Sequence, residues 1–283
     1  MATNRFIGNA LAVAQADKGT PGGTIEVSDK FKADINGKVF SYSATGTTVA
    51  SVTAGFTTAW NALDATLYPE FAEITAADKT TYIELQADTA GKPFTVTLST
   101  TESDDAAADL QTFVRTADVA NSGPNNWDVA ANWSLGTVPV AADDVVLEQT
   151  AVNILYGLAQ AAVTLTSLTI ESTFTGQLGL PERTATAYDE YRGTYLAIGA
   201  TTVTFKDGEG TSSGRFKLDT GSVATTINVG KLGSPAEIGL GALVWKGTNA
   251  ANVLNVQKGK VSVAPFGGET ATIATLRLGY VTG

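Results

Sequence analysis

The sequence predicts a mainly β protein, in which a small N-terminal α+β module precedes a short right-handed parallel β-helix. From about residue 144 to residue 280, short runs of Val, Ile, Leu, Thr and Phe alternate with Gly, Asn, Asp and Ser. This is strand chemistry interrupted by turn chemistry. Three successive apolar runs take up roughly twenty-odd residues, which is the length of one coil with three short strands. This repeat favours stacked parallel coils. A β-sandwich remains the alternative, although only LDTGSVA reads as an antiparallel hairpin.

Composition excludes several classes of function. The chain has 283 residues, a formal net charge of −10, and no Cys or His. Disulfides, thiolate nucleophiles, imidazole bases and the usual zinc sites are therefore excluded. An acidic surface repels phosphates, so we expect neither nucleic acid nor an anionic membrane as a partner.

Residues 1–23 are predicted to form an N-terminal arm. NRFIGNALAVAQADK suits one strand or a short helix, and GTPGG then breaks it. Such an arm either packs on a neighbouring subunit or adds a strand to the chain's own sheet. The arm lacks the apolar core of a signal peptide, and no stretch reaches membrane-spanning length. We therefore expect assembly in a cytoplasm.

Residues 24–118 are predicted to form the α+β module, with four or more strands and one helix. TIEVSD reads as a strand, and Asn36-Gly37 is a strong two-residue hairpin signal. The one helix spans TTVASVTAGFTTAWNAL, where Thr47 or Thr48 is the N-cap. TTYIELQAD and KPFTVTLST follow as strands joined by a turn at Gly91. The apolar helix positions recur at spacings of three and four and predict one buried face, namely Val49, Val52, Phe56, Trp60 and Leu63.

Residues 119–143 are predicted to be an irregular joint, and residues 144–283 the β-helix. The joint is rich in Asn, Gly, Pro and Asp and holds Trp127 and Trp133. Two hypotheses fit these indoles. They either form an aromatic platform for a sugar or plug the open end of a solenoid, and the second is preferred.

Several stretches resemble structural proteins of tailed-bacteriophage virions. INGKVFSYSA, the helix, FAEITA and ADTAGKPFTVTLST together look like a small module that recurs in such proteins. The Asn-Trp…Asn-Trp-Ser…Asp-Asp-Val pattern of the joint resembles the segment ahead of β-helical passenger regions in large surface proteins. TYLAIGATTVTFKDGEG, RFKLDTGSV, ALVWKGTNAANVLNV and FGGETATIATLRLGY resemble a β-helical phage protein of the head-decoration or head-fibre type. The resemblance implies a component of the virion.

One polar and aromatic excursion, residues 179–195, interrupts the second half. A loop that concentrates charge and Tyr on a charge-poor scaffold is the best candidate for a partner contact. Its competing interpretation is a solvated loop with local ion pairs. The candidate contact residues are Glu182, Arg183, Tyr188, Asp189, Tyr191 and Arg192.

No catalytic constellation is found, so we predict no enzyme activity, no cofactor and no metal site. A carboxylate pair for glycoside hydrolysis could combine Asp189 or Glu190 with Asp207, Glu209 or Asp219, but no pattern brings two of them together. Calcium at Asp207–Glu209 or Asp143–Asp144 is equally weak, because neither stretch has the spacing of a known calcium loop.

The expected function is that of a non-enzymatic capsid decoration or cement protein, which binds the major capsid protein on the virion surface and stabilises the head. The alternative is a tail fibre or tailspike that binds a host receptor such as a glycan. We also expect a homotrimer, because the last coil ends at LRLGYVTG without a polar cap.

Overall fold

The computed structural model describes residues 3–65, 67–103, 110–180, 194–206, 215–232 and 240–279. The chain divides into two compact units, residues 11–123 and residues 1–10 together with 124–283. The protein is mainly β, as predicted. The expected arm of residues 1–23 is not one element, since its first ten residues fold with the C-terminal half of the chain and the rest with the module.

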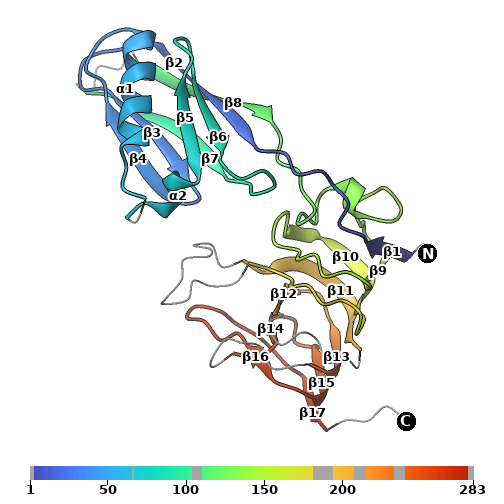
Figure 1. Cartoon of the computed structure of the whole chain (residues 1–283). Coiled ribbons are helices and arrows are strands. Elements are labelled where there is room, and N and C mark those ends of the chain that lie inside the picture. Colours follow the sequence, from blue (N-terminus) through green and yellow to red (C-terminus); the bar gives the residue numbers. More distant parts are fainter. Residues whose placement is uncertain are drawn as a thin grey trace. The chain divides into compact units, whose positions relative to one another are not determined.

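The unit of residues 11–123, which we call the module, contains two antiparallel sheets in the described residues, ordered β5-β6-β2-β8 and β4-β3-β7 (Figure 1). Helix α1 contacts β2, β4, β5 and β6, and so members of both sheets. The strands are β2 (Ala16–Gly23), β3 (Lys30–Ile35), β4 (Lys38–Ser43), β5 (Ile74–Asp78), β6 (Ile83–Ala87), β7 (Val96–Thr101) and β8 (Gln111–Val119), and the helices are α1 (Val49–Asn61) and α2 (Pro69–Ala72).

The predicted hairpin and helix are confirmed. Strands β3 and β4 pair antiparallel around Asn36 and Gly37, whose φ angles of 50° and 89° fit the two-residue turn that this dipeptide favours. Thr48 caps α1, and a capping box links it to Ser51. Trp60 is buried on the inner face of α1, and its Nε1 donates a hydrogen bond to the Ile74 carbonyl at 2.9 Å.

Two strand predictions in the module are wrong. GTPGG was expected to break the chain but lies in β2, while TIEVSD lies between strands. Pro21 has no backbone N–H to donate to a neighbouring strand. It is tolerated in β2 because strand β6 pairs with β2 only over Ala16–Gly19, so β6 requires no hydrogen bond from Pro21. At Gly19 a Cβ atom would lie 2.8 Å from the Phe113 ring, so a residue without a side chain is needed there.

The turn at Gly91 does not join a hairpin. Strand β6 belongs to the four-stranded sheet and β7 to the three-stranded sheet, so the chain changes sheets between them. Local turn chemistry predicts the reversal of direction but not the partner of the next strand.

The second unit, which we call the ladder unit, is organised around a large sheet. Within the described residues this sheet has ten strands, and every pair of strands in it is parallel. Purely parallel pairing disagrees with the β-sandwich alternative, which requires antiparallel hairpins. The strands are β1 (Thr3–Phe6), β9 (Asp144–Leu147), β10 (Ala159–Ile170), β11 (Leu196–Phe205), β12 (Phe216–Asp219), β13 (Thr226–Lys231), β14 (Leu243–Lys246), β15 (Val253–Lys258), β16 (Val261–Val263) and β17 (Thr275–Leu278).

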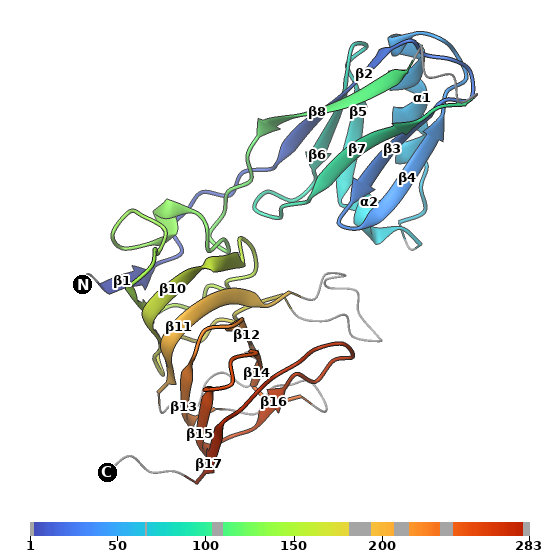
Figure 2. The ribbon, with the colours of Figure 1, turned by 180° about the vertical axis from the view of Figure 1, so that it is seen from behind.

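The parallel strands lie in two stacks. One stack runs through β1, β9, β10, β11, β13, β15 and β17, and the other through β11, β12, β14 and β16 (Figure 2). In the first stack, register places side chains over one another in two inner columns, which are apolar except for Asn4. One inner column is Phe6, Leu147, Ile170, Phe205, Val229, Val256 and Leu278; the neighbouring column is Asn4, Val145, Leu168, Val203, Ile227, Leu254 and Leu276.

The β1 end of the ladder is covered. Trp127 and Trp133 are 0% and 1% exposed, and their rings pack edge to face with centroids 4.7 Å apart. Phe6 packs on Trp133 at 5.3 Å. Burial of both indoles agrees with the plug hypothesis and contradicts the sugar platform, which requires exposed rings.

The β17 end of the ladder is not covered by described residues. Leu276 and Leu278 are 53% and 72% exposed, whereas Leu254 directly before Leu276 in its column is 2% exposed. Phe6 and Leu278, the two ends of one inner column, are therefore buried and exposed, respectively.

Each unit has its own core, and each core contains a test residue. Trp60→Ala and Trp245→Ala are expected to cost about 3–5 kcal/mol each, because both indoles are almost completely buried. Chemical denaturation should show the loss from Trp60→Ala in the module and that from Trp245→Ala in the ladder unit. Val140→Ala is the control and should stay within about 0.5 kcal/mol of wild type, because its side chain is exposed.

The buried position of β1 gives a second prediction. Phe6→Ala should lower the stability of the ladder unit by about 3–5 kcal/mol, since Phe6 is 1% exposed in a column of that unit. The stability of the module should not change, as Phe6 belongs to the other unit. Equal destabilisation of both units would contradict the assignment of β1.

Candidate functional site

The six predicted contact residues lie outside the described residues: Glu182, Arg183, Tyr188, Asp189, Tyr191 and Arg192. The described ends of this excursion, Leu180 and Thr194, form an antiparallel bridge. The Asp207–Glu209 stretch, considered above for calcium or a carboxylate pair, also lies outside them.

At the foot of the excursion, Tyr195 joins a cluster of charged side chains. Its ring centroid lies 4.7 Å from Lys217 Nζ and 4.4 Å from Lys246 Nζ. Its hydroxyl donates a hydrogen bond to Glu269 at 3.0 Å. Lys246 in turn lies 3.6 Å from Asp219 and 3.5 Å from Glu269. Cation–π contacts and ion pairs thus tie the foot of the excursion to β12, β14 and the segment after β16.

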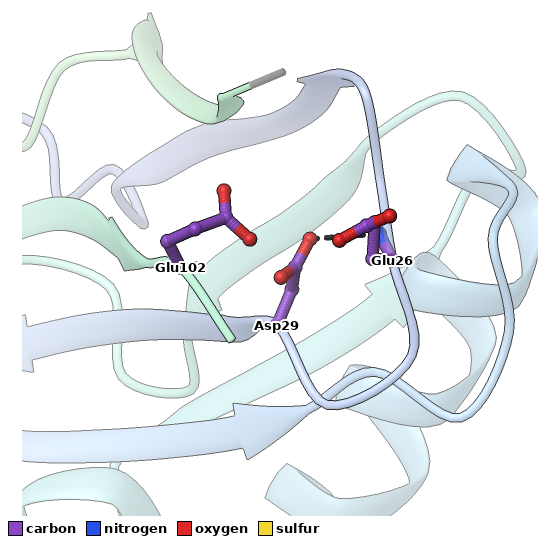
Figure 3. A group of neighbouring side chains, drawn as sticks. All are labelled: Glu26, Asp29 and Glu102. Carbon is purple, nitrogen blue, oxygen red and sulfur yellow. Dashed lines mark hydrogen bonds between the residues drawn. The ribbon is translucent and has the colours of Figure 1, made fainter. Parts of the chain in front are cut away.

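A second cluster contains three carboxylates in the module, Glu26, Asp29 and Glu102 (Figure 3). Each offers an oxygen atom, and these oxygens lie within 4.8 Å of one another. Asp29 is fully buried and lies directly before β3, while Glu102 follows β7. Strands β3 and β7 pair with Lys30 opposite Thr101, and this register brings Asp29 and Glu102 together.

Asp29 is held by backbone amides. Its Oδ2 accepts a hydrogen bond from the Glu26 amide at 2.7 Å, and its Oδ1 accepts one from the Ser103 amide at 3.2 Å. Burial by itself raises the pKa of Asp29, but three contacts outweigh it: the hydrogen bond from the Glu26 amide, a proton held by Glu102 and shared with Asp29, and the hydrogen bonds from Ser103. The pKa of Asp29 therefore lies below its ordinary value.

The donor set of this cluster consists only of oxygen, which is the set that calcium prefers. Asp29 nevertheless serves the fold without an ion, because its two amide contacts fasten the loop after β2 to the end of β7. The sequence pattern does not reveal the cluster, because TIEVSD, which contains Glu26 and Asp29, reads as a strand. Only the β3–β7 register reveals Glu102 beside them.

The remaining candidates from the sequence have structural partners. Asp143 accepts a hydrogen bond from the Val140 amide, and Asp144 accepts one from Ser167. Asp219 lines a surface cavity of about 80 Å³ together with Thr220 and Ser222. Such a cavity is smaller than the roughly 300–1,000 Å³ of a typical small-molecule site.

Comparisons with known proteins identify no family for this chain. No protein-family model, curated protein or solved structure matches it. Among the described residues, no helix has both the length and the apolar character required to cross a membrane.

The buried carboxylate predicts a pH-dependent contribution to stability. A carboxyl group whose folded-state pKa is lowered stabilises the fold above its unfolded pKa of about 3.9, and this contribution is lost as the pH falls through the folded pKa. Asp29→Asn should lower the stability of the module at pH 7 by about 1–3 kcal/mol, because two amide donors lose a charged acceptor.

The difference between Asp29→Asn and wild type should then shrink as the pH falls below about 4. Denaturant unfolding at several pH values measures it. Asp118→Asn is the control, because Asp118 pairs with Lys18 at the surface and such pairs contribute about 0–1 kcal/mol. An Asp29→Asn loss that is equal at pH 7 and pH 3 would disprove the electrostatic role.

Proposed function

We propose that this chain is a non-enzymatic structural protein of a bacteriophage virion, and that it decorates the capsid and stabilises the head. Its partners in this proposal are the major capsid protein and further copies of itself. It is assembled in the host cytoplasm and acts on the capsid surface. The sequence resemblance described above is the source of the virion assignment.

The observation that carries the structural role is the continuity of the inner columns. They extend from Asn4 and Phe6 to Leu276 and Leu278 without a break in register. Parallel stacking gives each inner strand two hydrogen-bonded neighbours, so the unit resists local opening. The described clusters of charge are engaged in contacts that hold segments of the chain together, as expected of a scaffold.

Within this proposal the ladder unit winds as a right-handed parallel β-helix. Side-chain hydrogen bonds between neighbouring strands of the first stack join residues 23, 27 and 22 positions apart, which is about one short coil per step. Crossovers between parallel strands are right-handed in nearly all proteins, so the same hand is assigned here.

A homotrimer is part of the proposal. The exposed side chains of Leu276 and Leu278 leave apolar surface at the β17 end of the ladder. Solenoids require their last coil to be covered, and copies that meet around a threefold axis can cover one another. Light scattering at micromolar concentration should give the mass of three chains. A stable monomer under these conditions would contradict the trimer.

Virions that lack this protein provide the test of location and role. A decoration protein stabilises the shell by mass action, and many copies act together. Particles without it should release their genome at a lower temperature than complete particles, while adsorbing to host cells at the normal rate.

The tail-fibre or tailspike alternative predicts the reverse pattern. Knockout particles would then keep their heat resistance and fail to adsorb. One heat-release assay and one adsorption assay on the same particles separate the two functions, and antibody labelling of complete particles locates the protein on head or tail. Normal heat resistance with failed adsorption would end the decoration hypothesis.

A further inference from the structure

Strand β1 lies in a slot of the ladder unit that is built entirely by residues far away in sequence. On one side it pairs in parallel with β9, from Thr3 opposite Asp144 to Phe6 opposite Leu147. On the other side it exchanges hydrogen bonds with residues 132–135. Arg5 donates its amide to the Ser134 hydroxyl at 2.9 Å and accepts the Ser134 amide at 2.8 Å.

The slot recognises the side chains of β1 individually. Asn4 is 0% exposed; its amide group donates to the Thr137 carbonyl at 2.8 Å, and its Oδ1 accepts the Leu135 amide at 3.3 Å. Phe6 fills the space against Trp133. On the outer face, Arg5 forms an ion pair with Glu148 at 2.6 Å. A buried amide, an aromatic anchor and a charge thus define a sequence-specific site for a short extended peptide.

None of these contacts depends on β1 belonging to the same chain. The hydrogen bonds of Arg5 span 129 and 143 positions of sequence. Along the chain, the module of residues 11–123 stands between β1 and the residues that form its slot. A β1 strand from a second copy finds the same partners at the same distances. Exchange of an identical element between copies costs little, because it replaces each contact with an equal one.

The segment that connects β1 to the module carries exposed apolar side chains. Ile7 is 40% exposed and Leu11 is 82% exposed. Residues 7–12 contain no strand or helix. Ile7, Gly8 and Ala10 donate their amides to Asn132, and Val13 donates to Ser122, so a change of direction toward a second copy falls at residues 11 and 12.

We propose that β1 is an exchangeable strand, and that in the assembled state β1 of one copy occupies the slot of a second copy. This goes beyond the proposed function, since it names the element that links copies and holds wherever in a virion the protein acts. High local concentration favours the exchanged form, because the intermolecular contact is then no rarer than the intramolecular one.

Cysteine cross-linking tests the exchange, and the natural chain contains no cysteine that could interfere. Arg5 and Val146 are direct register partners, and both side chains alternate with buried ones and so face outward. Full-length Arg5→Cys and Val146→Cys variants are refolded together at high concentration and oxidised. Exchange should yield disulfide-linked heterodimer at least about tenfold above the control mixture, because an occupied slot raises the effective thiol concentration.

The control mixture combines Arg5→Cys with Lys79→Cys, an exposed position in the module, and reports random collision. The double variant Arg5→Cys/Val146→Cys at high dilution should close its disulfide within one chain, which checks the geometry. Heterodimer no more abundant than in the control, together with intrachain closure of the double variant, overturns the proposal.

A second measurement is independent of disulfide geometry. Two differently tagged wild-type populations refolded together should co-purify through either tag. The Asn4→Ala/Phe6→Ala variant, which loses both anchors, should lose co-purification while its module and its ladder unit each keep a cooperative unfolding transition. Co-purification should persist in Leu276→Ser/Leu278→Ser, which removes the exposed apolar side chains at the β17 end. Wild-type copies that refold as separate monomers at every concentration tested overturn the exchange regardless of the cross-linking result.

Discussion

The ladder unit depends on in-register parallel pairing. Each inner strand satisfies its backbone groups on the strands before and after it, and the same register stacks its side chains. Val203, for example, pairs with Leu168 on one side and Ile227 on the other, and all three are fully buried. The sequence needs only two apolar positions in each strand to continue such a column. The segments between strands are then free to differ in length and chemistry.

The same constraint makes the two ends of the ladder special, because an end strand has only one neighbour. At the β1 end the chain covers its last strand with residues 132–135 and two indoles, and Trp133 donates its Nε1 hydrogen to the Trp127 carbonyl at 2.7 Å. At the other end the register partners Asn228, Asn255 and Arg277 form a polar column, in which Arg277 donates to Asn255 and Asn255 donates to Asn228. The polar column thus reaches the final strand, while the adjacent apolar side chains there stay exposed.

The parts of the fold that the sequence predicts well are those specified by neighbouring residues. The Asn36-Gly37 turn needs positive φ at both positions, and the α1 stripe of Val52, Phe56 and Trp60 needs only a helical period. Strand β2 was missed because its Gly and Pro residues look like a chain break, and its pairing with β8 is set by tertiary context.

The candidate sites show the same division between local and distant information. Asp29 and Glu102 are brought together by a sheet register that has no signature in either segment. The slot for β1 likewise joins segments separated by the whole module. The parallel arrangement itself was predictable, because repeated short apolar runs without hairpin signals favour it.

The module begins and ends at one place. Val13 near its start donates its amide to the Ser122 carbonyl near its end at 2.8 Å, and the ladder unit continues on both sides of this point. At the level of the gene, residues 11–123 therefore form one continuous cassette between the two segments of the ladder unit. Such a cassette can be gained, lost or replaced as one segment without shifting the register of any strand pair in the ladder unit. Variation in length among related genes should accordingly concentrate between the codons for Ala10 and Pro124.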